Sequence, residues 1–322
     1  MAQSNTSIHA ARTRSREQPE RQLPVAESPA VAFDLLPKPI SAREFELFQA
    51  LIYEVSGIWL SHAKTALLVG RLSKRLRQLG TPSFTDYYQV VTTVAEEQTR
   101  MLDAIATNET RFFREPAQFE FLKQRIAPEW QADAARGVRS RKIRVWSAGC
   151  STGQEPYSLA MALCRQFPAA AGWEIEIFAS DLSTRALAIA RAATWDAAKA
   201  GEIPELYLRA FMLRGRGEQK GKIQAGPEIR SVVRFLPLNL NERSYPLPSQ
   251  FDLILCRNVL IYFDRESRQK VVRRLLKHLS ARGYLFVGHA ESLHTMNDIL
   301  RGVITTVYAP IPPKKLQAHG PR

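Results

Sequence analysis

The sequence predicts a two-part fold, in which a small all-helical domain precedes a larger α/β domain built on a doubly wound, mostly parallel sheet. Apolar residues recur at helical spacing through residues 41–106, whereas short β-branched runs alternate with helical segments after residue 140. Strands that alternate with helices are typical of a parallel sheet with helices on both faces. The chain has 322 residues, 45% of them hydrophobic, which is enough for two cores.

The first ordered residues are expected near residue 40. Residues 1–38 are rich in Ser, Arg, Gln, Ala and Pro without periodicity, which predicts a disordered basic leader. Ser41 can cap a helix whose first turn carries Glu44, and Gly57 interrupts the apolar repeat that follows.

A second helix is predicted over residues 61–79, ending at Gly80. It is expected to bury five leucines: Leu67, Leu68, Leu72, Leu76 and Leu79. It also carries a concentrated group of cations: Arg71, Lys74, Arg75 and Arg77. Segments near 84–94 and 96–106 complete a helical domain over 39–106, which a linker over 107–140 joins to the next domain.

The α/β domain is expected over residues 141–312, with residues 313–322 as a tail. Its predicted strands lie at 142–147, 174–180, 233–238, 251–256 and 284–288, with a last strand at 303–308. A Gly- and charge-rich stretch over residues 195–232 interrupts the alternation and is interpreted as an insertion.

Composition narrows the class of protein. The net charge of +14 favours a polyanionic partner, such as nucleic acid, an anionic membrane surface or an acidic protein. Cys150, Cys164 and Cys256 lack the spacing of a disulfide framework or a zinc site. Without a secretory or membrane-spanning segment, the chain is expected in the cytoplasm.

A ligand site is predicted where the first two strands end, because doubly wound sheets bind ligands beyond the carboxyl ends of their strands. The first strand leads into a loop in which Gly149 and Gly153 allow a tight turn and a close approach to a ligand. Asp181 ends the second strand, where a carboxylate can accept hydrogen bonds from two ribose hydroxyls.

The residue that opens the next helix indicates which nucleotide is bound. Glu155 would repel a pyrophosphate, and the loop has GxxxG rather than the GxGxxG of dinucleotide sites. A carboxylate there suits a ligand with an ammonium and a sulfonium, which favours S-adenosylmethionine. The alternative is that Glu155 only complements the positive end of the helix dipole.

Four stretches then resemble one family. Residues 107–115 read TNETRFFRE, 145–158 read VWSAGCSTGQEPYS, 256–264 read CRNVLIYFD and 286–292 read FVGHAES. In this order and spacing they resemble the CheR chemotaxis receptor methyltransferases over residues 41–310. The resemblance implies a Rossmann-like methyltransferase sheet of seven strands with the last antiparallel, and a small β-subdomain at the 195–232 insertion.

By motif position, the resemblance also implies site residues. Those expected to bind the cofactor are Asn108, Thr110, Arg114, Gly149, Glu155, Asp181, Asn239, Leu240, Arg257 and Asn258. Arg114 and Tyr262 are expected to act on the substrate. On the bare sequence, Arg114 would be interpreted as a surface residue paired with Glu115 and Tyr262 as a core aromatic; the motifs reverse this interpretation. One departure is Gln154, where the family often has a second acidic residue.

The implied reaction transfers a methyl group from S-adenosylmethionine to glutamates of chemoreceptor helices and leaves S-adenosylhomocysteine, with no metal. The four cations Arg71, Lys74, Arg75 and Arg77 would dock the acidic receptor, unless they form only a solvated face. A glycine-spaced hairpin with Gly215, Gly217 and Gly221 resembles the subdomain with which some members capture a receptor's C-terminal peptide. We expect a monomer, recruited to receptor arrays at the inner membrane.

Two other functions compete. A nucleic-acid methyltransferase would explain the charge, but base amino-group methylation usually needs an Asp/Asn-Pro-Pro-aromatic stretch where residues 257–260 read RNVL, and no Pro-Cys is present for cytosine C5 chemistry. Nucleic acid is therefore not the expected partner. A non-catalytic regulator that binds the cofactor is the second alternative, and the presence of Arg114 and Tyr262 counts against it.

Overall fold

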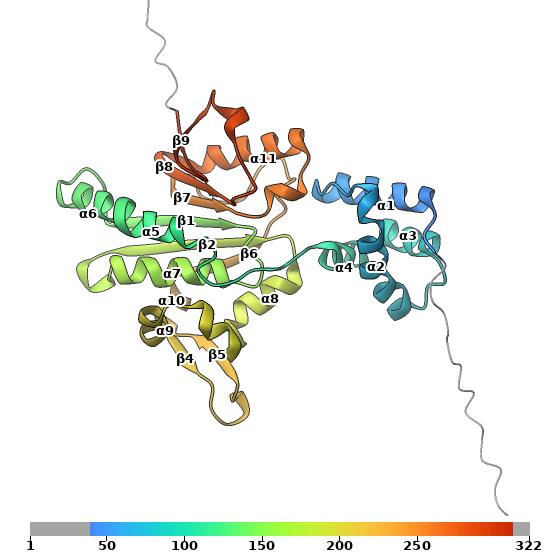
Figure 1. Cartoon of the computed structure of the whole chain (residues 1–322), viewed down its shortest axis with the longest axis horizontal. Helices are drawn as coiled ribbons and strands as arrows, with labels where there is room; N and C mark the ends of the chain where they lie inside the picture. The colour runs from blue at the N-terminus through green and yellow to red at the C-terminus, as the bar shows by residue number, and fades with distance from the viewer. Residues whose placement is uncertain (1–38, 312–322) are drawn as a thin grey trace, which may run out of the picture. The chain divides into compact units, whose positions relative to one another are not determined.

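The computed structural model describes residues 39–311 and begins with a helical region (Figure 1). Helix α1 spans Ala42–Ser56 and starts with a complete capping box, in which Ser41 and Glu44 bond to each other's backbone N–H. It ends at Gly57 in the left-handed conformation. Both predicted ends of this helix are therefore confirmed.

Three more helices complete this region: α2 (Thr65–Leu79, after a 3₁₀ turn at His62–Lys64), α3 (Phe84–Thr93) and α4 (Ala95–Ile105). Leu68, Leu72 and Leu76 are buried as predicted, whereas Leu67 and Leu79 are 38% and 40% exposed. Leu67 lies about 100° around the helix from the buried stripe. Leu79 is the last helical residue, where Gly80 turns the chain away.

Two of the four cations predicted to dock a receptor make internal contacts. Arg75 pairs with the buried Glu97 at 2.5 Å, and Glu97 also accepts the Tyr87 hydroxyl at 2.9 Å. Arg71 donates to the carbonyls of residues 104, 105 and 106 at the end of α4. Lys74 and Arg77 are exposed and remain as cations of the predicted docking face.

The sheet contains seven strands in the order β6-β2-β1-β7-β8-β10-β9. Their bounds are β1 Lys142–Ala148, β2 Glu174–Asp181, β6 Val233–Pro237, β7 Phe251–Cys256, β8 Leu279–Val287, β9 Leu300–Ile304 and β10 Val307–Pro310. The first five strands in this order are parallel, and β10 is antiparallel to both of its neighbours. The Rossmann-like α/β class is thus confirmed.

The prediction of a single last strand at residues 303–308 is wrong. Thr305 and Thr306 form the turn of a hairpin, with Thr306 at φ 69°, so that Val303 belongs to β9 and Tyr308 to β10. A continuous β-branched run gave no sign of this turn, since neither Gly, Pro nor Asn marks it.

Helices cover both faces of the sheet. Ile143 and Val145 of β1 pack in one core with residues of α7 (Gln154–Gln166) and α6 (Ala127–Ala135). Trp146 and Ala148 face a second core that contains residues of α11 (Arg265–His278). The other helical segments are α5 Pro116–Phe121, a π-helical turn Leu122–Ile126, α8 Thr184–Ala192, and 3₁₀ turns at Ala169–Ala171, Leu260–Tyr262 and His294–Met296.

Between α8 and β6 lies a separate small sheet, in the order β3-β5-β4 (Figure 1). Its antiparallel strands are β3 Thr194–Asp196, β4 Met212–Arg214 and β5 Lys222–Ala225. The connecting segments are 3₁₀ turns at Ala197–Glu202 and Gly217–Gln219, helix α9 Glu205–Phe211 and helix α10 Pro227–Ser231. This is the β-subdomain that the resemblance implied for the insertion.

Candidate active site

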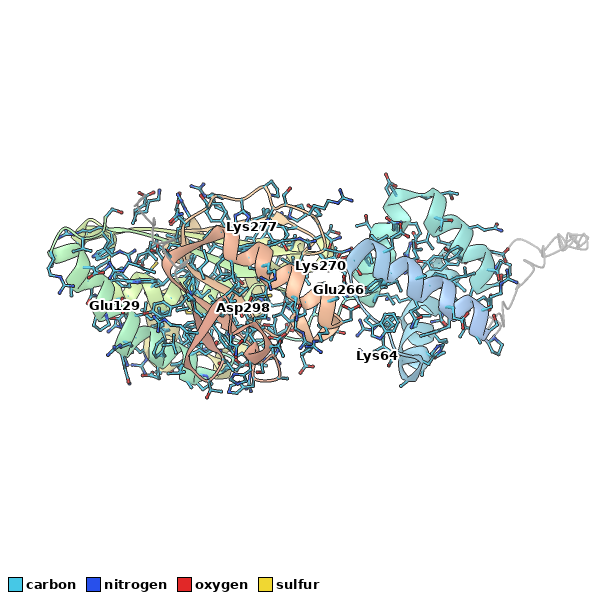
Figure 2. The ribbon with its side chains drawn as sticks, turned by 90° about the horizontal axis from the view of Figure 1, so that it is seen from above. Lys64, Glu129, Glu266, Lys270, Lys277 and Asp298 are labelled. Atoms are coloured by element: carbon cyan, nitrogen blue, oxygen red, sulfur yellow. The ribbon has the colours of Figure 1, made fainter. Side chains whose placement is uncertain are left out.

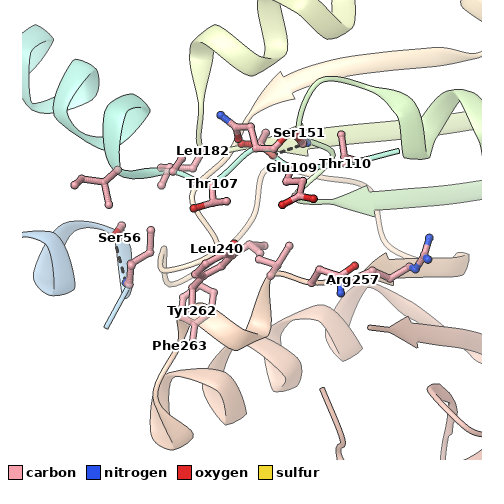
Figure 3. Close-up of a pocket in the computed structure, with 18 of the residues that line it drawn as sticks. Ser56, Thr107, Glu109, Thr110, Ser151, Leu182, Leu240, Arg257, Tyr262 and Phe263 are labelled. Atoms are coloured by element: carbon pink, nitrogen blue, oxygen red, sulfur yellow. Dashed lines mark hydrogen bonds between the residues drawn. The ribbon is translucent and has the colours of Figure 1, made fainter. Parts of the chain in front are cut away.

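The loops after β1, β2, β6 and β7 meet at one pocket at the carboxyl edge of the sheet (Figure 3). Every residue predicted to bind the cofactor or to act on the substrate carboxylate lines it: Asn108, Thr110, Arg114, Gly149, Glu155, Asp181, Asn239, Leu240, Arg257, Asn258 and Tyr262. These residues come from five separate segments, which the fold brings together at one pocket.

Gly149 lets the first loop pack against the loop after β7. Its φ is 85°, and a Cβ atom there would lie 2.4 Å from the Val259 side chain. Its N–H and that of Cys150 both donate to the Ser180 carbonyl, at 2.8 and 2.9 Å. Any larger residue would displace Val259 from the pocket wall.

Asp181 is held in place by two backbone groups. One carboxylate oxygen accepts the N–H of Ser151 at 2.7 Å, and the other accepts that of Ser183 at 2.8 Å. Burial raises the pKa of Asp181 above its ordinary value, and these N–H groups oppose the rise. Since each carboxylate oxygen has two acceptor positions, one per oxygen remains for a ligand hydroxyl.

Glu155 and Arg257 form a buried ion pair at the other side of the first loop. Glu155 accepts the Ser147 hydroxyl at 2.7 Å and the Arg257 Nη1 at 3.2 Å. Burial raises the pKa of Glu155, and Arg257 opposes the rise. The Arg257 side chain is 1% exposed, and its Nε has no hydrogen-bond partner among the residues described.

Arg114 lies in a strained turn. Phe113 and Glu115, on either side of it, have φ values of 49° and 58°, which non-glycine residues rarely adopt. Arg257 donates to the Arg114 carbonyl, and the Phe113 N–H donates to the Ser158 hydroxyl at 2.9 Å. The surrounding contacts therefore hold the turn in a conformation that the local sequence does not favour.

The Arg114 side chain does not pair with Glu115. Glu115 instead contacts Arg257 at 3.4 Å and His289 Nδ1 at 3.1 Å. Burial acts to raise the pKa of Glu115, but Arg257 and His289 together hold it below its ordinary value. Arg114 donates through Nη1 to the Glu109 carbonyl at 3.2 Å, which leaves its other guanidinium donors for a ligand.

Tyr262 lies in the 3₁₀ turn Leu260–Tyr262, and Figure 3 shows it beside Phe263 and Leu240 at the pocket. Its side chain is partly exposed rather than buried in a core. The Lys64 ammonium lies 5.9 Å from the centre of its ring, and its carbonyl accepts the Trp59 N–H at 2.8 Å. The position is that of a pocket residue rather than a core aromatic.

Asn239 has a role that the sequence did not indicate. Its amide nitrogen donates to the Val55 carbonyl at the end of α1, at 2.6 Å, and its amide oxygen accepts the Asn241 N–H at 2.9 Å. Asn241 donates to the neighbouring Glu54 carbonyl at 3.0 Å. The loop after β6 therefore caps the last turn of α1 with two asparagines while Asn239 lines the pocket.

The helical region supplies a pocket wall that sequence reasoning missed. Ser56, Ile58, Leu60, Lys64, Leu67, Ile105 and Ala106 all line the pocket, and Figure 3 shows Ser56 at the end of α1. Ile58 forms a β-bridge with Phe263, which brings the segment after α1 to the loop after β7. The apolar run that follows Gly57 was the only available signal for this wall.

The cysteines next to the pocket are not exposed as nucleophiles. All three cysteines are buried, and burial raises the pKa of Cys150 and Cys256 well above the ordinary thiol value. In residues 39–311 no group of three or more His, Cys, Asp or Glu is placed to hold a metal ion. No helix in the same range has the length and apolar character to cross a membrane.

Both parts of the fold match known proteins. Residues 43–106 match the family model "CheR methyltransferase, all-alpha domain", and residues 108–309 match "CheR methyltransferase, SAM binding domain". The chain is 37% identical over 275 residues to the chemotaxis protein methyltransferase of Escherichia coli, covering 84% of this chain and 91% of that one. It is 35% identical over 270 residues to chemotaxis protein methyltransferase 2 of Pseudomonas aeruginosa, covering 83% and 93%.

Proposed function

The chain belongs to the CheR methyltransferase family, whose S-adenosylmethionine-dependent methylation serves chemotaxis, and we propose that its substrates are glutamate side chains of chemoreceptors. The products would be glutamate methyl esters and S-adenosylhomocysteine, in the service of sensory adaptation. The observation that carries the proposal is the pocket itself, where Arg114 and Tyr262 lie with all the predicted cofactor residues.

The chemistry of the pocket fits S-adenosylmethionine, which when bound supplies an electrophilic methyl group on a sulfonium. Asp181 would accept the two ribose hydroxyls, because its free acceptor positions lie at the end of β2. Glu155 would accept the ammonium of the amino-acid portion. The unpartnered Nε of Arg257 is a buried donor that suits the carboxylate of the same portion.

The substrate glutamate needs orientation more than activation. A free glutamate has a pKa of about 4.3, so it is already an anion near neutral pH and needs no general base. Arg114 would hold one carboxylate oxygen while the other attacks, and the Tyr262 hydroxyl would fix the same group. Because a tight ion pair would weaken the nucleophile, Arg114 is expected to orient the carboxylate rather than neutralise it.

Two surfaces would bring the receptor to the pocket. Lys74 and Arg77 are exposed on α2, the helix whose Leu67 lines the pocket, and would attract acidic receptor helices. Among the strands of residues 39–311, β4 pairs only with β5, so its outer edge can accept an added strand from a receptor's C-terminal peptide. Leu213 on this strand is 52% exposed.

The proposal is tested with methyl-labelled S-adenosylmethionine and receptor-containing membranes, with RNA and DNA as competing acceptors. We expect base-labile label on receptor protein, since esters hydrolyse readily in base. The variant Tyr262→Phe should lose most of this label while it still binds S-adenosylhomocysteine. Base-stable label, label on nucleic acid, or cofactor binding without transfer to any receptor would each contradict the proposal.

A further inference from the structure

A fully buried carboxylate lies next to the pocket and has no part in the mechanism above. Glu291, in the loop after β8, is 0% exposed. One of its oxygens accepts the N–H groups of Asn258 at 2.7 Å and Gly288 at 2.6 Å, and the other accepts that of Ile261 at 3.2 Å. Glu291 therefore binds backbone groups of two different loops.

The first of these loops carries Asn258 and Tyr262, in addition to Arg257 at its start. It leaves β7 at residue 257 and brings Asn258 and Tyr262 to the pocket. Asn258 has a φ of 60°, so the loop starts in a conformation that non-glycine residues rarely adopt. Without a carboxylate at position 291, the N–H groups of Asn258 and Ile261 would lose their hydrogen-bond partner. The left-handed conformation at Asn258 would then no longer be stabilised by these bonds.

The fit between the two loops is close. Strands β7 and β8 are adjacent and parallel, so the loops that follow them start side by side. A Cβ atom at Gly288 would lie 2.6 Å from the side-chain amide nitrogen of Asn258 and 2.8 Å from a carboxylate oxygen of Glu291. Only glycine leaves room at this position for Glu291 to reach the Asn258 backbone.

The same short loop also contacts the turn that carries Arg114. The backbone N–H of His289 donates to Glu115 at 3.2 Å, and the His289 ring lies 3.1 Å from the same oxygen. Residues 288–291 thus contact both segments that bear the proposed catalytic side chains. The stronger of the two attachments is that of Glu291, which is fully buried, whereas the His289 side chain is 63% exposed.

We propose that Glu291 is a positioning residue for methyl transfer. Its carboxylate holds the turn over residues 258–262 so that the Tyr262 hydroxyl meets the substrate carboxylate and Asn258 meets the cofactor. It touches neither ligand and acts through these two residues. This inference rests on the proposed function, because the reaction it serves is methylation of a receptor glutamate.

The substitution Glu291→Gln tests it. Glutamine has the same shape and volume as glutamate, but its NH₂ group would face a backbone N–H in place of a carboxylate oxygen. Two donors cannot hydrogen-bond to each other, so the turn should shift. The expected result is a kcat roughly 10- to 100-fold lower, with the KM for receptor nearly unchanged. The matched control is Glu266→Gln on the outer face of α11, where Glu266 is 75% exposed and pairs with Lys270 (Figure 2); its kcat should equal that of the wild type.

A double-mutant cycle separates positioning from general destabilisation. If Glu291 acts through Tyr262, adding Glu291→Gln to Tyr262→Phe should lower kcat by less than about 3-fold. Equal fold-losses in both backgrounds, or an unchanged kcat in Glu291→Gln, would overturn the inference. If circular dichroism shows that Glu291→Gln is unfolded, Glu291→Asp, whose shorter carboxylate reaches fewer donors, replaces it in the same cycle.

Failure of the proposed function is recognised separately. In that case the wild type and Glu266→Gln would methylate no receptor. The affinity for S-adenosylhomocysteine, measured by calorimetry, then tests the inference through Asn258. Roughly 10-fold weaker binding in Glu291→Gln than in Glu266→Gln supports the positioning role, and equal affinity overturns it.

Discussion

Two buried charge networks in this protein contain the same kinds of group but differ in how completely the groups are paired. In the helical region, Glu97 accepts Arg75 through both carboxylate oxygens and the Tyr87 hydroxyl through one of them. At the pocket, Arg257 lies between Glu155 and Glu115, yet the Arg257 Nε and one Glu115 oxygen are buried without a hydrogen-bond partner among the residues described.

The difference separates a structural network from a binding site. A complete network stabilises the fold, and losing one member leaves a buried charge without its partner. An incomplete network leaves donors and acceptors that a ligand can use. Until the ligand binds, these unpaired buried groups lower the stability of the folded protein. Substitutions in the first network should therefore change stability, and those in the second should change cofactor binding.

The largest expected effect is on stability, in Arg75→Ala. Glu97 is 3% exposed and would lose its two-pronged contact with Arg75, keeping only the exposed Arg100 at 3.8 Å, so the free energy of unfolding should fall by about 3 kcal/mol. Urea unfolding measures it, with the exposed Arg77→Ala as the control, expected within about 0.5 kcal/mol of the wild type. Where Arg75→Ala is folded, its affinity for S-adenosylhomocysteine should match the wild type. An unchanged stability would show that the network is not structural.

The next effect is on binding, in Asp181→Ala. The variant removes the acceptor for the ribose hydroxyls and frees the N–H groups of Ser151 and Ser183. Calorimetry should give an affinity for S-adenosylhomocysteine about 100-fold weaker, or about 2.7 kcal/mol. Asp298→Ala, an exposed acid that pairs with Arg273, serves as the control. Equal affinities in the two variants would remove Asp181 from the cofactor site.

A smaller effect is expected for Glu155→Gln, which should weaken cofactor binding and leave stability nearly unchanged, whereas Arg75→Ala should do the reverse. Arg257 keeps Glu115 and the Arg114 carbonyl as partners, so the free energy of unfolding should change by at most about 1 kcal/mol. Loss of the partner for the cofactor ammonium should weaken S-adenosylhomocysteine binding roughly 10-fold. A large loss of stability with unchanged binding would reverse the assignment of the two networks.

The pH dependence of binding follows from the same carboxylate. Burial raises the pKa of Glu155, with Arg257 opposing the rise, so its proton is taken up at a higher pH than by an ordinary glutamate. Only the ionised form attracts an ammonium. The affinity for S-adenosylhomocysteine should therefore be full at pH above this raised pKa and fall as the pH drops through it. Calorimetry over a pH series should show this fall in the wild type and a weaker one in Glu155→Gln; a flat wild-type profile would contradict the role of Glu155.

The smallest effect concerns the wall contributed by the helical region. Leu67 and Leu79 are on the same helix and similarly exposed, at 38% and 40%, but only Leu67 lines the pocket. Leu67→Ala should raise the KM for the cofactor or the receptor roughly 3-fold, and Leu79→Ala should not, with both variants near wild-type stability. Identical kinetics in the two variants would show that this wall does not contact the ligands.

The polar wall of the pocket could be predicted from the sequence because its residues lie in continuous motifs at strand ends. Asp181 and Glu155 were predicted from their places at a strand end and a helix start beside the glycine loop, and the motifs add Arg257 and Tyr262. The wall from the helical region could not be predicted, because Ile58 and Leu67 reach the pocket only through packing between segments far apart in the chain. The internal partners of Arg71 and Arg75 were missed for the same reason. The hairpin at Thr306 was missed because its turn lacks the usual residues.

The most direct test is an experimental structure of this protein with S-adenosylhomocysteine. We predict that the ribose hydroxyls bond to Asp181, the ammonium bonds to Glu155, and the carboxylate bonds to the Arg257 Nε, which has no partner among the described residues. Arg114 and Tyr262 should then flank the position of the missing methyl group. A ligand bound elsewhere, or bound with the Arg257 Nε still unpartnered, would contradict the claim that the incomplete network is the cofactor site.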